Sequence, residues 1–170
     1  ITTGDENVAV GYDALTTNTT GAQNAAVGKD ALKVNVDGGN NSAFGYGSLD
    51  ANTSASNNSA FGSNALGANN TGANNTSLGY NAGDVITTGS DNIIIGSGSD
   101  PSAAAASNQI VIGKGATGHG NNIAVIGNGS ATAIHPHDDE EVDLGSSSYQ
   151  YKDLYVHGVA YADAIGFGTV

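Results

Sequence analysis

The chain has 170 residues, a formal net charge of −12 at pH 7, and no cysteine, methionine or tryptophan. Its 16 acidic residues against 4 basic ones repel phosphate groups, which argues against nucleic-acid binding and association with anionic membranes. No apolar run approaches the ~18 residues that cross a bilayer, so we expect no membrane insertion. The 26 glycines and the low charged fraction of 12% fit either low-complexity disorder or a thin repetitive β-structure.

A repeat decides between these two classes. The segments "NVAVG", "NAAVG", "NSAFG" (twice), "NTSLG" and "NIIIG" follow one another, and "NQIVIG" and "NIAVIG" carry one residue more. Their glycines keep one 17-residue period until the last interval, which is shorter: Gly11, Gly28, Gly45, Gly62, Gly79, Gly96, Gly113 and Gly127. The leading asparagines are Asn7, Asn24, Asn41, Asn58, Asn75, Asn92, Asn108 and Asn122. A register held over eight units predicts an ordered repeat protein.

Each unit predicts one coil of a parallel β-solenoid: a strand, a tight bend, a short second strand and a loop. A large residue precedes each glycine, and a small one precedes that in the first units, as in Ala43-Phe44. Strand alternation sends them to opposite faces. We expect the large residues, with a leucine series (Leu15, Leu32, Leu49, Leu66), to fill the roll. We expect the Ala/Gly face to pair identical chains, with a trimer as the simplest closed ring.

The step "N-x-A-[large]-G-x-x-A-L" resembles the head repeat of trimeric autotransporter adhesins. The resemblance implies that residues 1–131 form a left-handed parallel β-roll, all-β, of about eight 17-residue coils, with three chains side by side. The period is slightly longer than is usual for such heads. At ~4.8 Å per coil, eight units would extend roughly 40 Å.

The repeat stops after Ser130, and residues 132–170 differ in kind. The run "DLGSSSYQYKDLYVHG" (143–158) resembles a segment of bacteriophage tail fibres, where it often precedes a trimerisation chaperone released by self-cleavage. The resemblance implies a small, β-rich, intertwined fibre segment, and we expect a C-terminal chaperone to have been trimmed or cleaved from a longer protein.

Two clusters in this second segment are candidate ligand sites. His135 and His137 flank Pro136, and in a trimer their six rings could hold an axial transition metal. The alternative is that both rings face solvent beside a turn. The acidic run Asp138–Asp143 could hold a hard cation such as Ca²⁺, although it matches no known calcium loop and a solvated charge run is favoured.

Two series in the repeat have a structural and a functional interpretation. The leading asparagines either form a ligand ladder or cap the backbone of the next coil, and the second is favoured. Tyr12, Tyr46 and Tyr80 follow the glycine in alternate units. They either stack on sugars or cover the edge of the roll, and packing is favoured.

The sequence predicts a non-enzymatic fibre or adhesin segment that stiffens and presents a tip recognising a host or prey surface. We expect a homotrimer outside the cell, on a virion tail or a bacterial surface, with a glycan or protein receptor. No catalytic, cofactor-binding or resident metal residue is expected. Two alternatives stay open: a polysaccharide-cleaving tailspike-like enzyme, and a monomeric solenoid that binds a ligand along its face. An ice-binding solenoid is excluded because the Thr-x-Thr ladder is missing.

Overall fold

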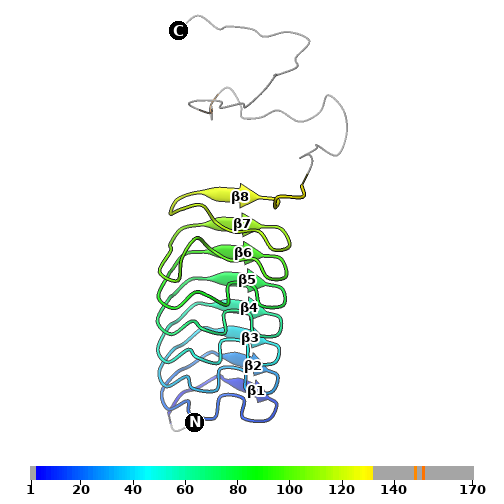
Figure 1. Ribbon diagram of the computed structural model, residues 1–170. Helices are drawn as coiled ribbons and strands as arrows, with labels where there is room; N and C mark the ends of the chain where they lie inside the picture. The colour runs from blue at the N-terminus through cyan, green and yellow to red at the C-terminus, as the bar shows by residue number, and fades with distance from the viewer. Residues whose placement is uncertain (1–2, 132–147, 149–150, 152–170) are drawn as a thin grey trace, which may run out of the picture. The chain divides into compact units, whose positions relative to one another are not determined.

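A computed structural model describes residues 3–131, 148 and 151, and the chain divides into two compact units, Ile1–Thr132 and Ala133–Val170. The described part of the first unit contains eight strands of three residues each (Figure 1). They are β1 (Val8–Val10), β2 (Ala25–Val27), β3 (Ser42–Phe44), β4 (Ser59–Phe61), β5 (Thr76–Leu78), β6 (Ile93–Ile95), β7 (Ile110–Ile112) and β8 (Ala124–Ile126).

The eight strands form one parallel sheet in sequence order, with each strand paired to the next. Partners are separated by one full period of the repeat, as in Ala43↔Ala60, except that Val111 pairs with Val125 across a shorter coil. Parallel neighbours need a connection of a dozen or more residues, and here the rest of each coil supplies it. The prediction of an all-β parallel solenoid is confirmed: it has about 7 turns of about 17 residues, and the described residues contain no helix.

The predicted second strand of each coil is wrong. The leucine series instead lies in tight turns with left-handed backbone, φ 49 to 52° for Leu15, Leu32, Leu49 and Leu66. Bulky residues rarely adopt this conformation, so the surrounding structure must hold them there. Asn and Asp occupy other left-handed corners, for example Asn64 (φ 54°) and Asp30 (φ 60°), where their short polar side chains tolerate it.

The assignment of the two strand faces is also wrong. The middle, small residue of the strand is the buried one: Ala26, Ala43 and Ala60 are each fully buried. The large residue after it points outward, with Phe44 at 38% exposure. The reason is volume, because the leucines already fill the narrow interior and only a small side chain fits opposite them.

The later coils support this explanation. Where the leucine is lost, as at Gly83 in the fifth coil, a buried Ile86 takes up core volume. In the next two coils the inward strand residue is no longer small but is Ile94 and then Val111, both fully buried. When a coil lacks the large leucine, a larger buried side chain elsewhere in the coil therefore fills the core.

The leading asparagines cap the backbone of the next coil, which confirms the structural interpretation. Asn41 is representative: its Oδ1 accepts from Asn58 N at 3.0 Å, and its Nδ2 donates to Ala55 O at 2.8 Å. Two members were misassigned, Asn108 and Asn122: Gln109 and not Asn108 continues the ladder by donating its backbone N–H to Asn92 Oδ1 at 3.0 Å, and Asn122 Oδ1 instead accepts from Asn108 Nδ2 at 2.7 Å. The extra residue in "NQIVIG" moves Asn108 to an exposed left-handed corner (φ 54°).

A second ladder, which was not predicted from the sequence, is formed by the asparagine three residues after each leucine of the series. Its members are Asn18, Asn35, Asn52 and Asn69. The amides bond directly from coil to coil: Asn35 Nδ2 to Asn18 Oδ1 at 2.7 Å and Asn52 Nδ2 to Asn35 Oδ1 at 2.8 Å. The ladder ends where Ile86 replaces asparagine, which leaves Asn69 Oδ1 buried with no partner among the described residues. Satisfied buried amides specify a unique register, because any slip would orphan several polar groups.

Candidate interaction surface

The outer face of the sheet, formed by the first and third residues of the eight strands, carries an apolar residue at the third position of every strand, while Ser42, Ser59 and Thr76 occupy the first position in three middle strands. Its exposed apolar side chains run the length of the sheet, with exposures from 38% to 57%. They are Val8, Val10, Phe44, Phe61, Leu78, Ile93, Ile110 and Ile126. Phe44 and Phe61 stack on adjacent coils, with ring centroids 5.0 Å apart and an interplanar angle of 7°. Exposed apolar side chains gathered in this way are typical of interaction surfaces.

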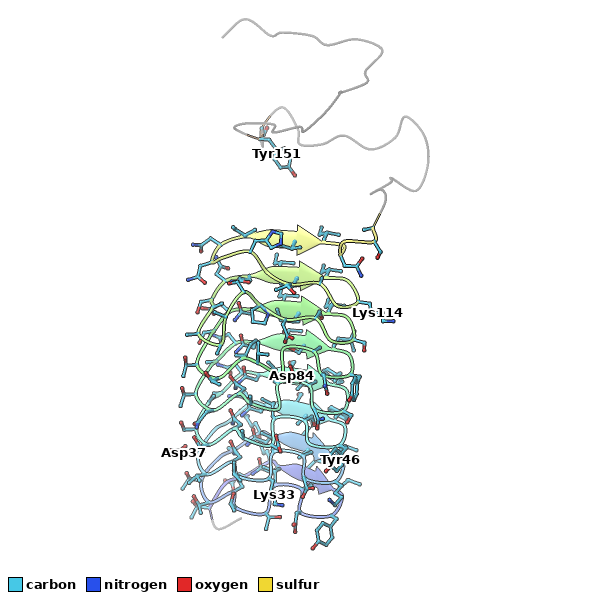
Figure 2. The ribbon with its side chains drawn as sticks, viewed as in Figure 1. Lys33, Asp37, Tyr46, Asp84, Lys114 and Tyr151 are labelled. Atoms are coloured by element: carbon cyan, nitrogen blue, oxygen red, sulfur yellow. The ribbon has the colours of Figure 1, made fainter. Side chains whose placement is uncertain are left out.

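A second series, here called the tyrosine column, comprises the residue after each glycine from Gly11 to Gly113. It consists of Tyr12, Lys29, Tyr46, Ser63, Tyr80, Ser97 and Lys114, all of them exposed except the half-buried Ser63. Backbone bonds keep it regular, such as Asn64 N to Tyr46 O at 2.8 Å and Asn81 N to Ser63 O at 3.0 Å. Figure 2 shows Tyr46 and Lys114 projecting from the same edge of the coils. The favoured prediction that the tyrosines cover the roll edge is wrong for the single chain, because Tyr12, Tyr46 and Tyr80 are 53 to 70% exposed.

Lys29 lies between two of these rings. Its Nζ is 5.9 Å from the Tyr12 centroid and 5.1 Å from the Tyr46 centroid, within cation–π range of both. The same ammonium bonds Asp30 Oδ2 at 2.9 Å. The regular register of the repeat could have revealed this arrangement from the sequence, since it places Lys29 midway between the two tyrosines.

Asp30 also joins a small charge cluster. Lys33 Nζ lies 3.0 Å from Asp30 Oδ1 and 3.6 Å from Asp13 Oδ2. Hydrogen bonds from Lys29 and then Lys33 lower the pKa of Asp30, and its carboxylate in turn raises the pKa of both lysines. Two of the four lysines are therefore held in ion pairs, and this pairing leaves the formal net charge of −12 unchanged.

Asp84 and Asp100 are two neighbouring carboxyl groups with no lysine between them among the described ion pairs. Burial first, and then the neighbouring Asp84 carboxylate, raises the pKa of Asp100 above its ordinary value of 3.8. Asp100 Oδ1 is buried and has no partner in the described part of the chain. Among residues 3–131, 148 and 151, no group of three or more His, Cys, Asp or Glu side chains could hold a metal.

Because the folded state holds the Asp100 proton more tightly than the unfolded chain, this group's contribution to stability falls as pH rises above 3.8. Asp100→Asn is therefore expected to raise the melting temperature at pH 7, and to have little effect below pH 3.8, where both states are protonated. Asp30→Asn is the matched control, since its lowered pKa gives the opposite sign: it should destabilise at neutral pH and become neutral in acid. Melting curves of the two variants at both pH values check this, and equal shifts would contradict it.

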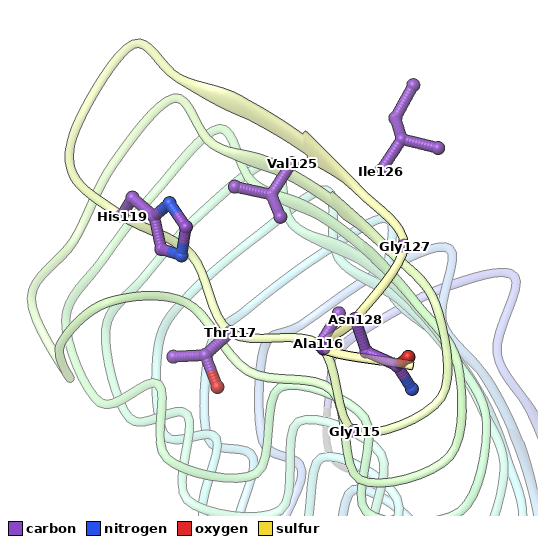
Figure 3. A pocket seen from close by; sticks show the side chains of 9 residues that line it. Gly115, Ala116, Thr117, His119, Val125, Ile126, Gly127 and Asn128 are labelled. Atoms are coloured by element: carbon purple, nitrogen blue, oxygen red, sulfur yellow. The ribbon is translucent and has the colours of Figure 1, made fainter. Parts of the chain in front are cut away.

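A hollow of about 490 Å³ lies at the β8 end of this unit. Thr117, His119 and Asn128 are its larger polar lining residues, and Figure 3 shows Val125 pointing into it and Ile126 away. Within residues 3–131 it lies at the last coil, which is shorter than the coils before it.

The predicted ligand clusters, His135 with His137 and the acidic run Asp138–Asp143, lie outside the described residues. Comparison with family models, with curated proteins and with solved structures finds no match for this chain. The resemblance to adhesin heads and tail fibres therefore stays a prediction from the residues quoted above. No helix in the described ranges is long and apolar enough to cross a membrane.

Proposed function

We propose that this chain is a non-enzymatic segment of a trimeric extracellular fibre, either a phage-type tail fibre or a bacterial adhesin. It would stiffen the fibre and present a tip that recognises a glycan or protein on a target surface. The observation that carries the proposal is the bare outer face of the sheet. All-parallel sheets occur almost only with both faces covered, and here the described unit covers one face alone.

Three copies of the same chain would cover the outer face. The third strand position is apolar along all eight strands and repeats at the coil spacing, so identical copies side by side would present matching rows at every level. This replaces the Ala/Gly contact that the sequence suggested, because those alanines are buried within the chain. The threefold closure, the left-handed winding and an intertwined segment after residue 131 remain parts of the proposal, taken from the resemblance to adhesin heads and tail fibres.

The stiffness would come from the repetition itself. Every coil is fastened to the next by strand pairing and by the asparagine ladders, so bending would stretch several bonds at each level. A stiff trimer displays three copies of whatever recognises the target, and multivalency raises avidity without any new contact.

Native mass spectrometry of the intact chain tests the proposal. The expected species is a trimer, with three times the chain mass of 16.7 kDa. The same spectrum reports a bound metal, which a His135→Ala variant would lose if the histidines hold it. A monomer at every concentration tested would overturn the fibre proposal and favour a lone solenoid.

A further inference from the structure

Lys29 shows what the tyrosine column can hold. Its ammonium sits between the rings of Tyr12 and Tyr46, which belong to coils two apart, at 5.9 and 5.1 Å from their centroids. Asp30 supplies a hydrogen-bond acceptor at 2.9 Å. One side chain of the protein thus occupies a space bounded by two aromatic faces and an acceptor.

The register repeats the same pair of tyrosines one step along the column, with no lysine between them. Tyr46 and Tyr80 are again two coils apart, which is about 9.6 Å at the usual strand spacing. The residue between them is Ser63, whose side chain is too short to reach between the rings. Since Lys29 lies against one face of Tyr46, the other face lies on the side of Ser63 and Tyr80. Both tyrosines are more than half exposed, at 53% and 58%.

We infer that the slot between Tyr46 and Tyr80, above Ser63, binds a lysine side chain of a basic partner protein. Lys29 demonstrates that a four-carbon ammonium side chain fits between tyrosines at this spacing. The amide of Asn64 stands where Asp30 stands beside Lys29, and its oxygen can accept a bond from the incoming ammonium. The net charge of −12 attracts a basic partner and speeds its encounter. This inference rests on the exposure of the column in the single chain and does not require the fibre proposal.

The test uses the full chain and a fluorescent pentalysine peptide, with binding followed by anisotropy at fixed ionic strength. Tyr80→Leu removes one wall without changing the charge, and is expected to weaken binding about threefold, as for one exposed cation–π contact. Fully acetylated pentalysine should bind far more weakly than pentalysine. Circular dichroism checks that each variant keeps the fold.

A matched pair of charge variants separates the slot from general attraction. Ser63→Lys places a lysine inside the slot, as Lys29 does in the first one, whereas Ser54→Lys adds the same charge at a loop position. Binding should fall about threefold further in Ser63→Lys than in Ser54→Lys. If the two variants weaken binding equally, if Tyr80→Leu binds like the unaltered chain, or if pentalysine does not bind at all, the inference is wrong.

Discussion

The double substitution Phe44→Asp with Phe61→Asp is expected to convert the proposed trimer into monomers. The two rings stack on each other at the middle of the outer face and are 38% and 40% exposed in the single chain. Fully burying a phenylalanine contributes about 1.5–3 kcal/mol, and roughly two fifths of each ring is still exposed, so three chains would lose on the order of 5 kcal/mol of association free energy. The new carboxylates would also be buried without partners. Native mass spectrometry or light scattering at several concentrations measures the change.

The matched control is Val36→Asp with Val85→Asp. These valines are similarly exposed, at 43% and 41%, and lie outside the strands, so the control adds the same charge without touching the outer face. It should remain trimeric. Dissociation in both variants would indicate general charge repulsion, and a trimer in both would place the interface elsewhere.

Gly62→Ala is expected to destabilise the described unit by about 3 to 4 kcal/mol. Gly62 has φ 141°, which side-chain-bearing residues rarely adopt, and an added Cβ would collide with the carbonyl oxygen of Gly79 on the next coil. That carbonyl belongs to a backbone row that cannot move without disturbing its neighbours. The measurement is thermal or denaturant unfolding at constant chain concentration, and amide exchange would show whether the loss is local to these two coils.

Gly98→Ala is its control. Gly98 also has a left-handed backbone, with φ 63°, but nothing lies within 4 Å of an added Cβ. Gly98→Ala should lower the free energy of unfolding only by the cost of placing alanine in a left-handed conformation, about 1 kcal/mol. Equal losses at Gly62 and Gly98 would mean that the close approach between coils contributes little.

The sequence alone sufficed for the register, the coil length and the parallel pairing, because each depends on spacing. It failed on which face of the strand is inside, because alternation divides residues into two faces and does not say which is buried. The sequence did contain a usable signal. After the leucine series stops, the middle residue of the strand is no longer small: it is Ile94 in β6 and Val111 in β7. Residues that exchange volume in this way must share a core.

The remaining errors concern backbone and polar geometry. No propensity predicts left-handed leucines such as Leu49 (φ 52°), because tertiary packing imposes that conformation. The second ladder was visible as asparagines in register, such as Asn35 and Asn52, but such residues also mark ordinary turns. As for the candidate surfaces, the tyrosines were found from the sequence, and the register of the repeat places Lys29 between two of them, whereas the exposure of the rings required the structure.

The asparagine ladders also bear on how such a protein can change over generations. In the coils that carry both ladders, from Asn18 to Asn69, each coil bonds to the coil before and the coil after it, and both neighbours offer the same amide and backbone partners. If one such repeat unit were duplicated or deleted in the gene, the coils on either side would therefore still form the same hydrogen bonds with their new neighbours. Each such event would change the length of this unit by about 4.8 Å. The length of the solenoid is thus set by the number of repeat units, and it can change in equal steps without a change in the structure of the coil.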